Sequence, residues 1–130
     1  MSFMNKFIDS NVIIFAFTNS NQKQKCRNIL AEENMIANTL ILLESYAKIA
    51  TINKSEIYAR NVIRSILSFE NVKVIDFTNN LFFESLKRSQ KYKLKISDLI
   101  HYTTALLQNC NQIISYDKHF NGLDIKRIEP

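Results

Sequence analysis

The chain has 130 residues, 46% hydrophobic and 22% charged, which suits one globular domain with a buried core and leaves little room for two. No apolar run reaches the roughly 18 residues of a membrane span, and the first residues lack the apolar stretch of a secretory signal, so we expect a cytoplasmic protein. One Gly and one Pro argue against an all-β design, and the net charge of +5 favours a polyanionic partner without requiring one.

The apolar pattern predicts short strands that alternate with helices. Helices are expected to begin at polar residues that cap their first turn, namely Ser10, Thr39, Ser55 and Ser97. In chain order we expect a strand over 6–8, helices over 11–17, 22–33, 40–50 and 55–69, a strand over 72–75, helices over 79–92 and 98–108, and strands over 112–115 and 124–128.

Short apolar strands separated by helices imply parallel crossovers and a sheet covered by helices on both faces. We therefore expect a single α/β domain over 1–130, with helical layers on either side of a mostly parallel, twisted sheet of four to five short strands. The two cysteines, Cys26 and Cys110, show no paired spacing, which predicts reduced thiols rather than zinc ligands.

Two acids follow predicted strands. Asp9 lies just past the first strand and Asp117 just past the strand over 112–115. Because ligands of parallel sheets bind beyond the carboxyl ends of the strands, both side chains are expected at the same edge. The alternative for each is an acid that merely caps a turn or a helix.

Two further acids lie in helices. Glu44 falls within the apolar helix 40–50, where burial of a lone carboxylate is costly unless a cation offsets it; the alternative is an exposed pair with Lys48. Asp98 opens its helix, a position that the helix dipole alone favours. His101 lies one turn further on and is left out of the expected site, because a lone histidine beside an acid is more often a satisfied structural residue.

Together, these acids and their surroundings resemble the PIN-domain nucleases over essentially the whole chain. The motifs that carry the resemblance are Asp9-Ser10-Asn11-Val12, Leu43-Glu44-Ser45-Tyr46-Ala47, Ser97-Asp98-Leu99 and Tyr116-Asp117-Lys118-His119-Phe120. Two positions depart from the family pattern: Asn11 stands where some relatives have Asp, and Leu99 where Ala is usual. In size and single-domain build, the chain is most similar to the VapC-type toxins of toxin–antitoxin pairs.

The resemblance implies a Mg²⁺- or Mn²⁺-dependent endoribonuclease with a PIN-like three-layer α/β/α sandwich. Asp9, Glu44, Asp98 and Asp117 are expected to be both its catalytic and its metal-binding residues, since hard oxygen ligands suit these cations. Ser115 is expected to steady Asp9 or Asp117, with Asn11 just outside the ligand set. Members of this type are usually dimeric and held inactive by a cognate antitoxin; the helices over 40–50 and 55–69 offer apolar residues for a dimer face.

Acids attract a cation but repel RNA, so lysines elsewhere must hold its backbone. Lys93 and Lys95 end the densest basic run, just before Asp98, while Lys48 and Lys118 lie beside predicted acids. These four lysines are the candidate RNA contacts. The alternative for the basic run is a solvated helix end and loop.

Two other classes of function remain open. A haloacid-dehalogenase-type phosphatase would need a second Asp two positions after Asp9, where this chain has Asn11. A phospho-acceptor receiver domain could use Asp76, but Ser10 breaks the acidic pair it requires, and neither alternative explains Glu44. A PIN-like fold without catalysis would serve as an RNA- or protein-binding module, although unused buried acids have a cost.

Overall fold

A computed structural model describes residues 4–130. Five strands and six α-helices make up this part of the chain, with one short 3₁₀ turn. In chain order they are β1 (Asn5–Ile8), α1 (Ser10–Ala16), α2 (Lys23–Leu30), β2 (Met35–Asn38), α3 (Thr39–Asn53), α4 (Glu56–Ser68), β3 (Val72–Ile75), α5 (Asn79–Lys87), α6 (Ile96–Leu107), β4 (Cys110–Ile114), η1 (Lys118–Phe120) and β5 (Lys126–Ile128). Within residues 4–130, no helix is long and apolar enough to cross a membrane.

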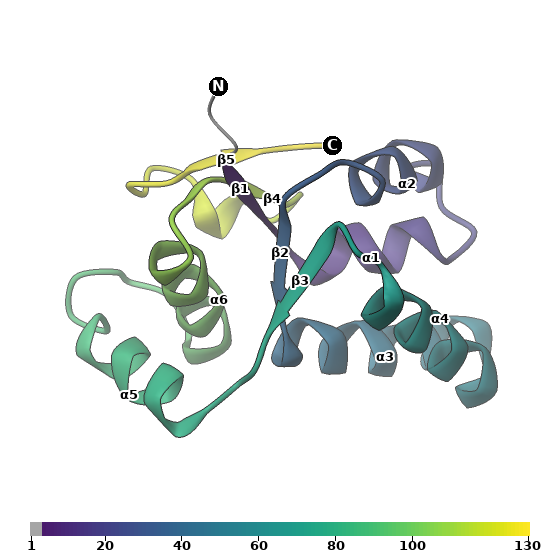
Figure 1. Cartoon of the computed structure of the whole chain (residues 1–130), viewed down its shortest axis with the longest axis horizontal. Coiled ribbons are helices and arrows are strands. Elements are labelled where there is room, and N and C mark those ends of the chain that lie inside the picture. Colours follow the sequence, from purple (N-terminus) through teal and green to yellow (C-terminus); the bar gives the residue numbers. More distant parts are fainter. Residues whose placement is uncertain (1–3) are drawn as a thin grey trace.

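The five strands form one sheet in the order β3-β2-β1-β4-β5, and every neighbouring pair is parallel. Helices α1 to α4 lie on one side of the sheet and α5 and α6 on the other (Figure 1). Central strand β1 places Phe7 beside Ile36 of β2 and Ile113 of β4. The predicted three-layer α/β/α sandwich is confirmed, and the sheet is parallel throughout.

The central strands are buried because helices cover both faces of the sheet. Consecutive residues of β1 and β4, including Phe7, Ile8, Ile113 and Ile114, have no exposed surface. A strand with one wet face would alternate apolar and polar residues instead. Asp9 and Asp117 therefore follow strands that end within the buried core.

Strand β2 was not expected from the sequence. All four of its residues, Met35 to Asn38, are buried beside β1 and β3. The segment is too short to show a period, it contains Ala and Asn, which are poor strand formers, and it runs directly into α3. Asn34 precedes it with φ of 63°, a left-handed conformation that ends the preceding turn.

Several predicted helix ends are corrected by the structure. Asp9 rather than Ser10 caps α1, and Asn38 rather than Thr39 caps α3, where its side chain accepts from the Ile41 amide at 2.8 Å. Ser55 does cap α4, as predicted. Helix α6 begins two residues earlier than expected, at Ile96 after Lys95, so Ser97 is not its cap. The helices over 22–33 and 79–92 are shorter than expected, and the last strand begins at Lys126 instead of 124.

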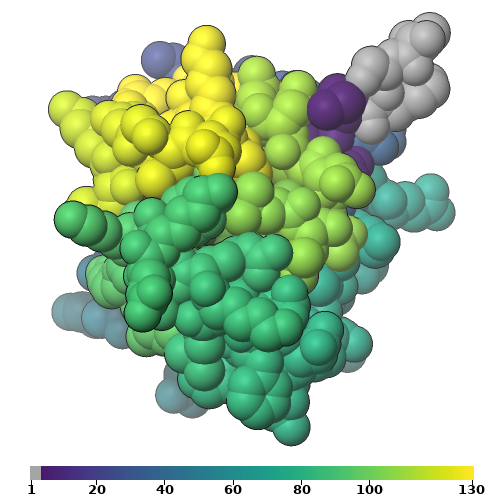
Figure 2. All heavy atoms as spheres, turned by 90° about the vertical axis from the view of Figure 1, so that its left-hand side faces the viewer, coloured from purple at the N-terminus to yellow at the C-terminus, as the bar shows by residue number. Residues whose placement is uncertain are grey.

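The segment that joins α5 to α6 is held against the end of the chain. The Tyr92 hydroxyl donates a 2.6 Å hydrogen bond to Asp124, and Tyr92 also stacks at 4.7 Å on Tyr102 of α6. In the space-filling view, α5 and this segment (green) cover α6 and meet the C-terminal residues (yellow) (Figure 2). These contacts fix the loop that carries Lys93 and Lys95 next to the start of α6.

Candidate active site

The four predicted acids come from four different elements at the carboxyl edge of the sheet. Asp9 follows β1, Asp117 follows β4, Asp98 lies in the first turn of α6, and Glu44 lies within α3. Asp9 and Asp117 also act as caps: Asp9 accepts from the Ser10 amide at 2.8 Å, and Asp117 from the His119 amide at 2.9 Å. Asp9 and Asp117 therefore cap the turns that follow them and also lie at the same edge of the sheet.

A buried serine ties the two strand-end acids together. The Ser115 hydroxyl donates to Asp9 Oδ2 at 2.6 Å and accepts from the Asp117 backbone amide at 2.9 Å. Asn11 Nδ2 donates to both Ser115 Oγ (3.2 Å) and Asp9 Oδ2 (3.3 Å). Ser115 has no exposed surface, so this network holds Asp9 in one orientation.

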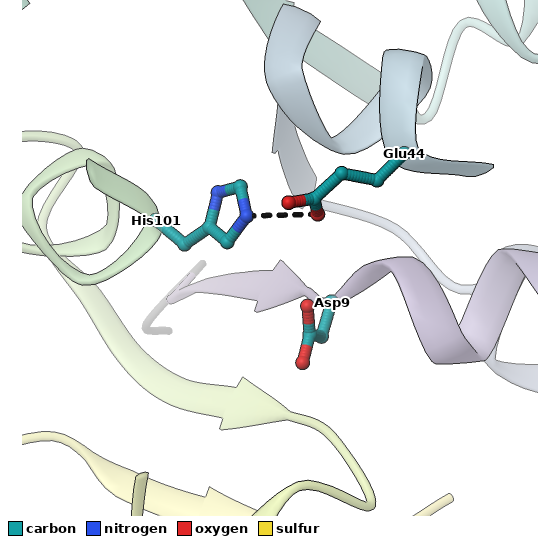
Figure 3. A group of neighbouring side chains, drawn as sticks. All are labelled: Asp9, Glu44 and His101. Atoms are coloured by element: carbon teal, nitrogen blue, oxygen red, sulfur yellow. Dashed lines mark hydrogen bonds and ion pairs between the residues drawn. The ribbon is translucent and has the colours of Figure 1, made fainter. Parts of the chain in front are cut away.

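Glu44 meets a histidine rather than a lysine. Its Oε1 atom lies 3.0 Å from His101 Nε2, and among the described residues it makes no pair with Lys48 (Figure 3). One ligand atom each from Asp9, Glu44 and His101 lies within 4.8 Å of the others. His101 was not among the expected site residues, although its spacing of three residues from Asp98 places both on neighbouring turns of one helix face.

The other two acids meet a second histidine. His119 Nδ1 lies 3.1 Å from Asp117 Oδ1 and 3.6 Å from Asp98 Oδ2. These three side chains also bring one ligand atom each to within 4.8 Å of the others. His119 was not among the expected site residues either, although it lies only two residues after Asp117, in the same short turn.

The two halves of the cluster interact electrostatically. Burial is the main cause that raises the pKa of Asp98, and the charges of Asp117 and Asp9 raise it further, against the opposing charge of Lys95. Burial also raises the pKa of Asp9; the Ser115 hydrogen bond opposes this shift and the charge of Glu44 adds to it. Asp9 and Asp98 are therefore the two carboxyls whose ionisation is disfavoured without a counter-ion.

One carboxylate oxygen in this acidic centre, Asp98 Oδ2, accepts no hydrogen bond from the described residues and has a long contact of 3.6 Å with His119 Nδ1. Asp98 is 7% exposed, and its Oδ2 atom is buried without a hydrogen bond within the described part of the chain. A buried carboxylate oxygen without a hydrogen bond is costly, and a divalent cation would offset that cost. The donor set of carboxylates, with an imidazole nearby, fits Mg²⁺ or Mn²⁺.

The candidate RNA-binding lysines lie at different distances from this centre. Lys93 and Lys95 line a hollow of about 270 Å³ together with Asp98 and His119. Lys118 begins the 3₁₀ turn directly after Asp117 and is exposed, and Lys48 is exposed on α3, one turn beyond Glu44.

Comparison with protein families gives a match to the PIN domain model over residues 6–126. The chain belongs to the PIN domain family. The match spans all four acids and nearly the whole described structure, which confirms the family expected from the sequence motifs. No curated protein was found to match the chain in sequence.

Solved structures with the same PIN fold include toxins of toxin–antitoxin pairs. VapC20 of Mycobacterium tuberculosis, titled a sarcin–ricin loop cleaving toxin, aligns with a TM-score of 0.77 at 13% identity, over 97% of this chain and 100% of its own. A toxin–antitoxin complex from Klebsiella pneumoniae aligns at 0.73 and 18% identity, over 95% and 96% of the two chains. VapBC2 of Rickettsia felis, bound to a promoter DNA fragment, aligns at 0.72 and 15% identity, over 97% and 98%.

The PIN fold also disfavours the receiver alternative. Asp76, the acceptor that alternative would use, follows β3, which is an edge strand of the sheet. The acids that converge instead follow β1 and β4, which are neighbours in the sheet. A phosphoryl acceptor at Asp76 would have no acidic partner from these strands.

Proposed function

We propose that this PIN domain is a divalent-cation-dependent endoribonuclease that acts as the toxin of a toxin–antitoxin pair. The observation that carries the proposal is a pair of neighbouring acidic groups, Asp9 with Glu44 and Asp98 with Asp117, in which the charges of Asp9 and Asp117 act on the buried Asp98 carboxyl. The structural neighbours support it, because they are a sarcin–ricin loop cleaving toxin and toxin–antitoxin complexes. Cleavage of a mixed pool of structured RNAs with added Mg²⁺ or Mn²⁺ tests it.

We infer the roles of the acids from their positions. When bound, the cation would supply an activated water at neutral pH and offset negative charge at the scissile phosphate. Asp9, Asp98 and Asp117 would hold it directly or through water, and His119 is placed to add a nitrogen ligand to the Asp98–Asp117 half. Glu44 would orient the attacking water or complete the ligand set.

Two residues around the ligands would keep Asp9 in place. Ser115 and Asn11 both donate to Asp9 Oδ2, which leaves Asp9 little freedom to rotate when charge changes nearby. Such supporting hydrogen bonds orient metal ligands and raise their affinity. We assign Ser115 and Asn11 this supporting role rather than a direct part in the chemistry.

The hollow beside Asp98 suits an RNA phosphate. Lys93 and Lys95 place two positive side chains on its wall, next to the edge where the acids meet. Phosphate contacts supply most of the affinity of a protein for a nucleic acid and position the backbone without reading sequence. The RNA strand would therefore enter over the loop between α5 and α6, with Lys118 and Lys48 as further contacts.

Replacing Lys93 and Lys95 by Ala is expected to raise KM for RNA while changing kcat little. Removal of each lysine that contacts phosphate should reduce the steepness of the plot of log affinity against log salt concentration by about 1. Fluorescence anisotropy with a labelled RNA at several salt concentrations measures both effects. The matched control is Lys73→Ala, because Lys73 lies at the amino ends of the strands, in a hollow with Asn5. An equal loss of RNA affinity in the control and the double variant would show that Lys93 and Lys95 do not contact the RNA.

A second copy of the chain is the proposed partner on the helical face of α3 and α4. Helix α3, expected to be buried, leaves Leu43 61% exposed, and Leu67 of α4 is 59% exposed beside it. The groove between them holds about 470 Å³ and includes Arg60, Arg64 and Asp76, so one patch carries apolar groups and both signs of charge. Such a patch can pair with itself across a two-fold axis.

Leu43→Glu combined with Leu67→Glu is therefore expected to convert a dimer into a monomer. Light scattering coupled to size exclusion at several concentrations measures the mass. Ile52→Glu, on the same helix and 46% exposed, is the control for a general effect of an added charge. A wild-type protein that is monomeric throughout, or a double variant that stays dimeric, would contradict this assignment. Co-expression with a candidate antitoxin from the neighbouring reading frame tests the other proposed partner separately.

A further inference from the structure

The hydrogen bonds around His101 determine which of its ring nitrogens carries the proton. His101 is 1% exposed on α6, and each nitrogen has one polar neighbour: Nδ1 lies 3.2 Å from Asn38 Nδ2, and Nε2 lies 3.0 Å from Glu44 Oε1. Whether Nδ1 accepts or donates depends on the orientation of the Asn38 amide.

Helix capping settles that orientation. Asn38 is the cap of α3, and its side-chain atom that faces the Ile41 amide at 2.8 Å must be the oxygen, because a backbone N–H donates. The other amide atom is therefore the NH₂ group, which faces His101 Nδ1 and Thr104 Oγ1, the latter at 3.0 Å. Thr104 uses its own hydroxyl proton on the Ile100 carbonyl at 2.8 Å, so it accepts from Asn38 as required.

A donor on Asn38 leaves His101 Nδ1 as the acceptor, so the ring proton is on Nε2. His101 Nε2 then donates to Glu44. The Ile41 amide donates to the Asn38 side-chain oxygen, the Asn38 NH₂ group donates to His101 Nδ1, and His101 Nε2 donates to the Glu44 carboxylate. A metal ligand at Nε2 would need its lone pair there and a proton on Nδ1, which would point at the Asn38 amide protons. The proximity of His101 to Asp9 and Glu44 is thus not that of a ligand.

We propose that His101 is a positioning residue, a neutral Nε2–H donor that fixes the Glu44 carboxylate toward the acidic centre. Within residues 4–130, Glu44 has no other hydrogen-bond partner, and its side chain is 32% exposed. The bond engages one carboxylate oxygen, Oε1, and leaves the other for a water or a cation (Figure 3). The catalytic part of this inference rests on the proposed nuclease function, whereas the proton position does not.

Nitrogen NMR of the full chain, labelled at histidine, tests the proton position directly. The expected spectrum shows a protonated Nε2 and an unprotonated Nδ1 for His101, both without cation and after saturation with Mg²⁺. Asn38→Asp keeps an acceptor for the α3 cap but removes the donor to Nδ1, so it is expected to move a proton onto Nδ1. A wild-type Nδ1 that carries the proton, or an Nε2 that loses its proton when Mg²⁺ binds, would overturn the proposal.

Kinetic variants test the positioning of Glu44. His101→Leu removes the donor and is expected to lower kcat about 10- to 100-fold with KM for RNA little changed. His101→Gln places an amide donor near the position of Nε2 and is expected to recover most of that loss. Thermal melting separates these effects from a loss of fold. Equal activity of the Leu variant and wild type would refute positioning; an inactive wild type would instead refute the nuclease proposal, and the NMR result would still decide the state of His101.

Discussion

Asp9→Asn and Asp98→Asn are each expected to lower cation-dependent RNA cleavage by at least about 10³-fold, because several kcal/mol of transition-state stabilisation depend on the cation they hold. Asn keeps the size of each side chain, and in Asp9→Asn the amide oxygen can still accept from the Ser10 amide, while its NH₂ group takes the place of Oδ2, the acceptor for Ser115 and Asn11. The loss should therefore appear in kcat without a change in circular dichroism. Cleavage is measured on a pool of structured RNAs with Mg²⁺ or Mn²⁺.

The matched control for these variants is Glu70→Gln, which removes an exposed acid beside the hollow at the amino ends of the strands. It should cleave as wild type does. Cutting that persists in both Asp variants would mean that the activity belongs to a contaminant or to another site, and the proposed mechanism would be wrong.

Although Asp98→Asn is expected to lower activity, it is expected to raise the stability of the cation-free protein. Burial and the neighbouring acids raise the pKa of Asp98 above its ordinary value of 3.8, so the folded protein binds a proton more tightly there than the unfolded chain does. Stability of the cation-free protein therefore falls as pH rises from 3.8 through the folded pKa. The variant lacks this loss, and its unfolding free energy at neutral pH should exceed that of wild type by roughly 0.5–2 kcal/mol.

Thermal denaturation in the presence of a chelator, at pH 3.5 and pH 7.5, measures this difference. The advantage of Asp98→Asn should be present at pH 7.5 and much smaller at pH 3.5, where the carboxyl is mostly protonated in both states. Added Mn²⁺ should raise the melting temperature of wild type and leave the variant almost unchanged. A variant that is less stable at pH 7.5 would show that the carboxylate is a net stabiliser through Lys95 or His119.

The parts of the fold that could be predicted are those with local signals. Phe7 and Ile8 before Asp9, and Ile113 and Ile114 before Ser115, form apolar runs that end in polar residues, so the strands and their carboxyl edge were recognisable. Strand β2 was missed because its formation depends on pairing with β1 and β3 rather than on its own four residues. The burial of α3 was overestimated, because an apolar helix surface does not reveal whether a neighbour covers it, as Leu43 shows.

In the candidate site, too, residues with local sequence signals were predicted and residues defined by contacts across the fold were not. The four acids were found because each follows a strand or lies in a helix in a family-like order, although their roles stay predictions. The two histidines were not predicted as site residues, because the contacts of His101 with Glu44 and of His119 with Asp98 join segments far apart in the sequence. His101 meets Glu44 57 residues away and depends on Asn38, the end of the missed strand. His119 gains its position only when α6 brings Asp98 beside the turn after Asp117.

Direct titration of the metal-free protein with Mn²⁺, followed by electron paramagnetic resonance, tests most directly the claim that the four acids hold a divalent cation. Wild type is expected to bind Mn²⁺ saturably, Mg²⁺ to compete for the same site, and Asp98→Asn to lose this binding while Glu70→Gln retains it. Absence of saturable binding in wild type, or equal binding in Asp98→Asn, would contradict the account and favour a PIN fold that serves as a binding module.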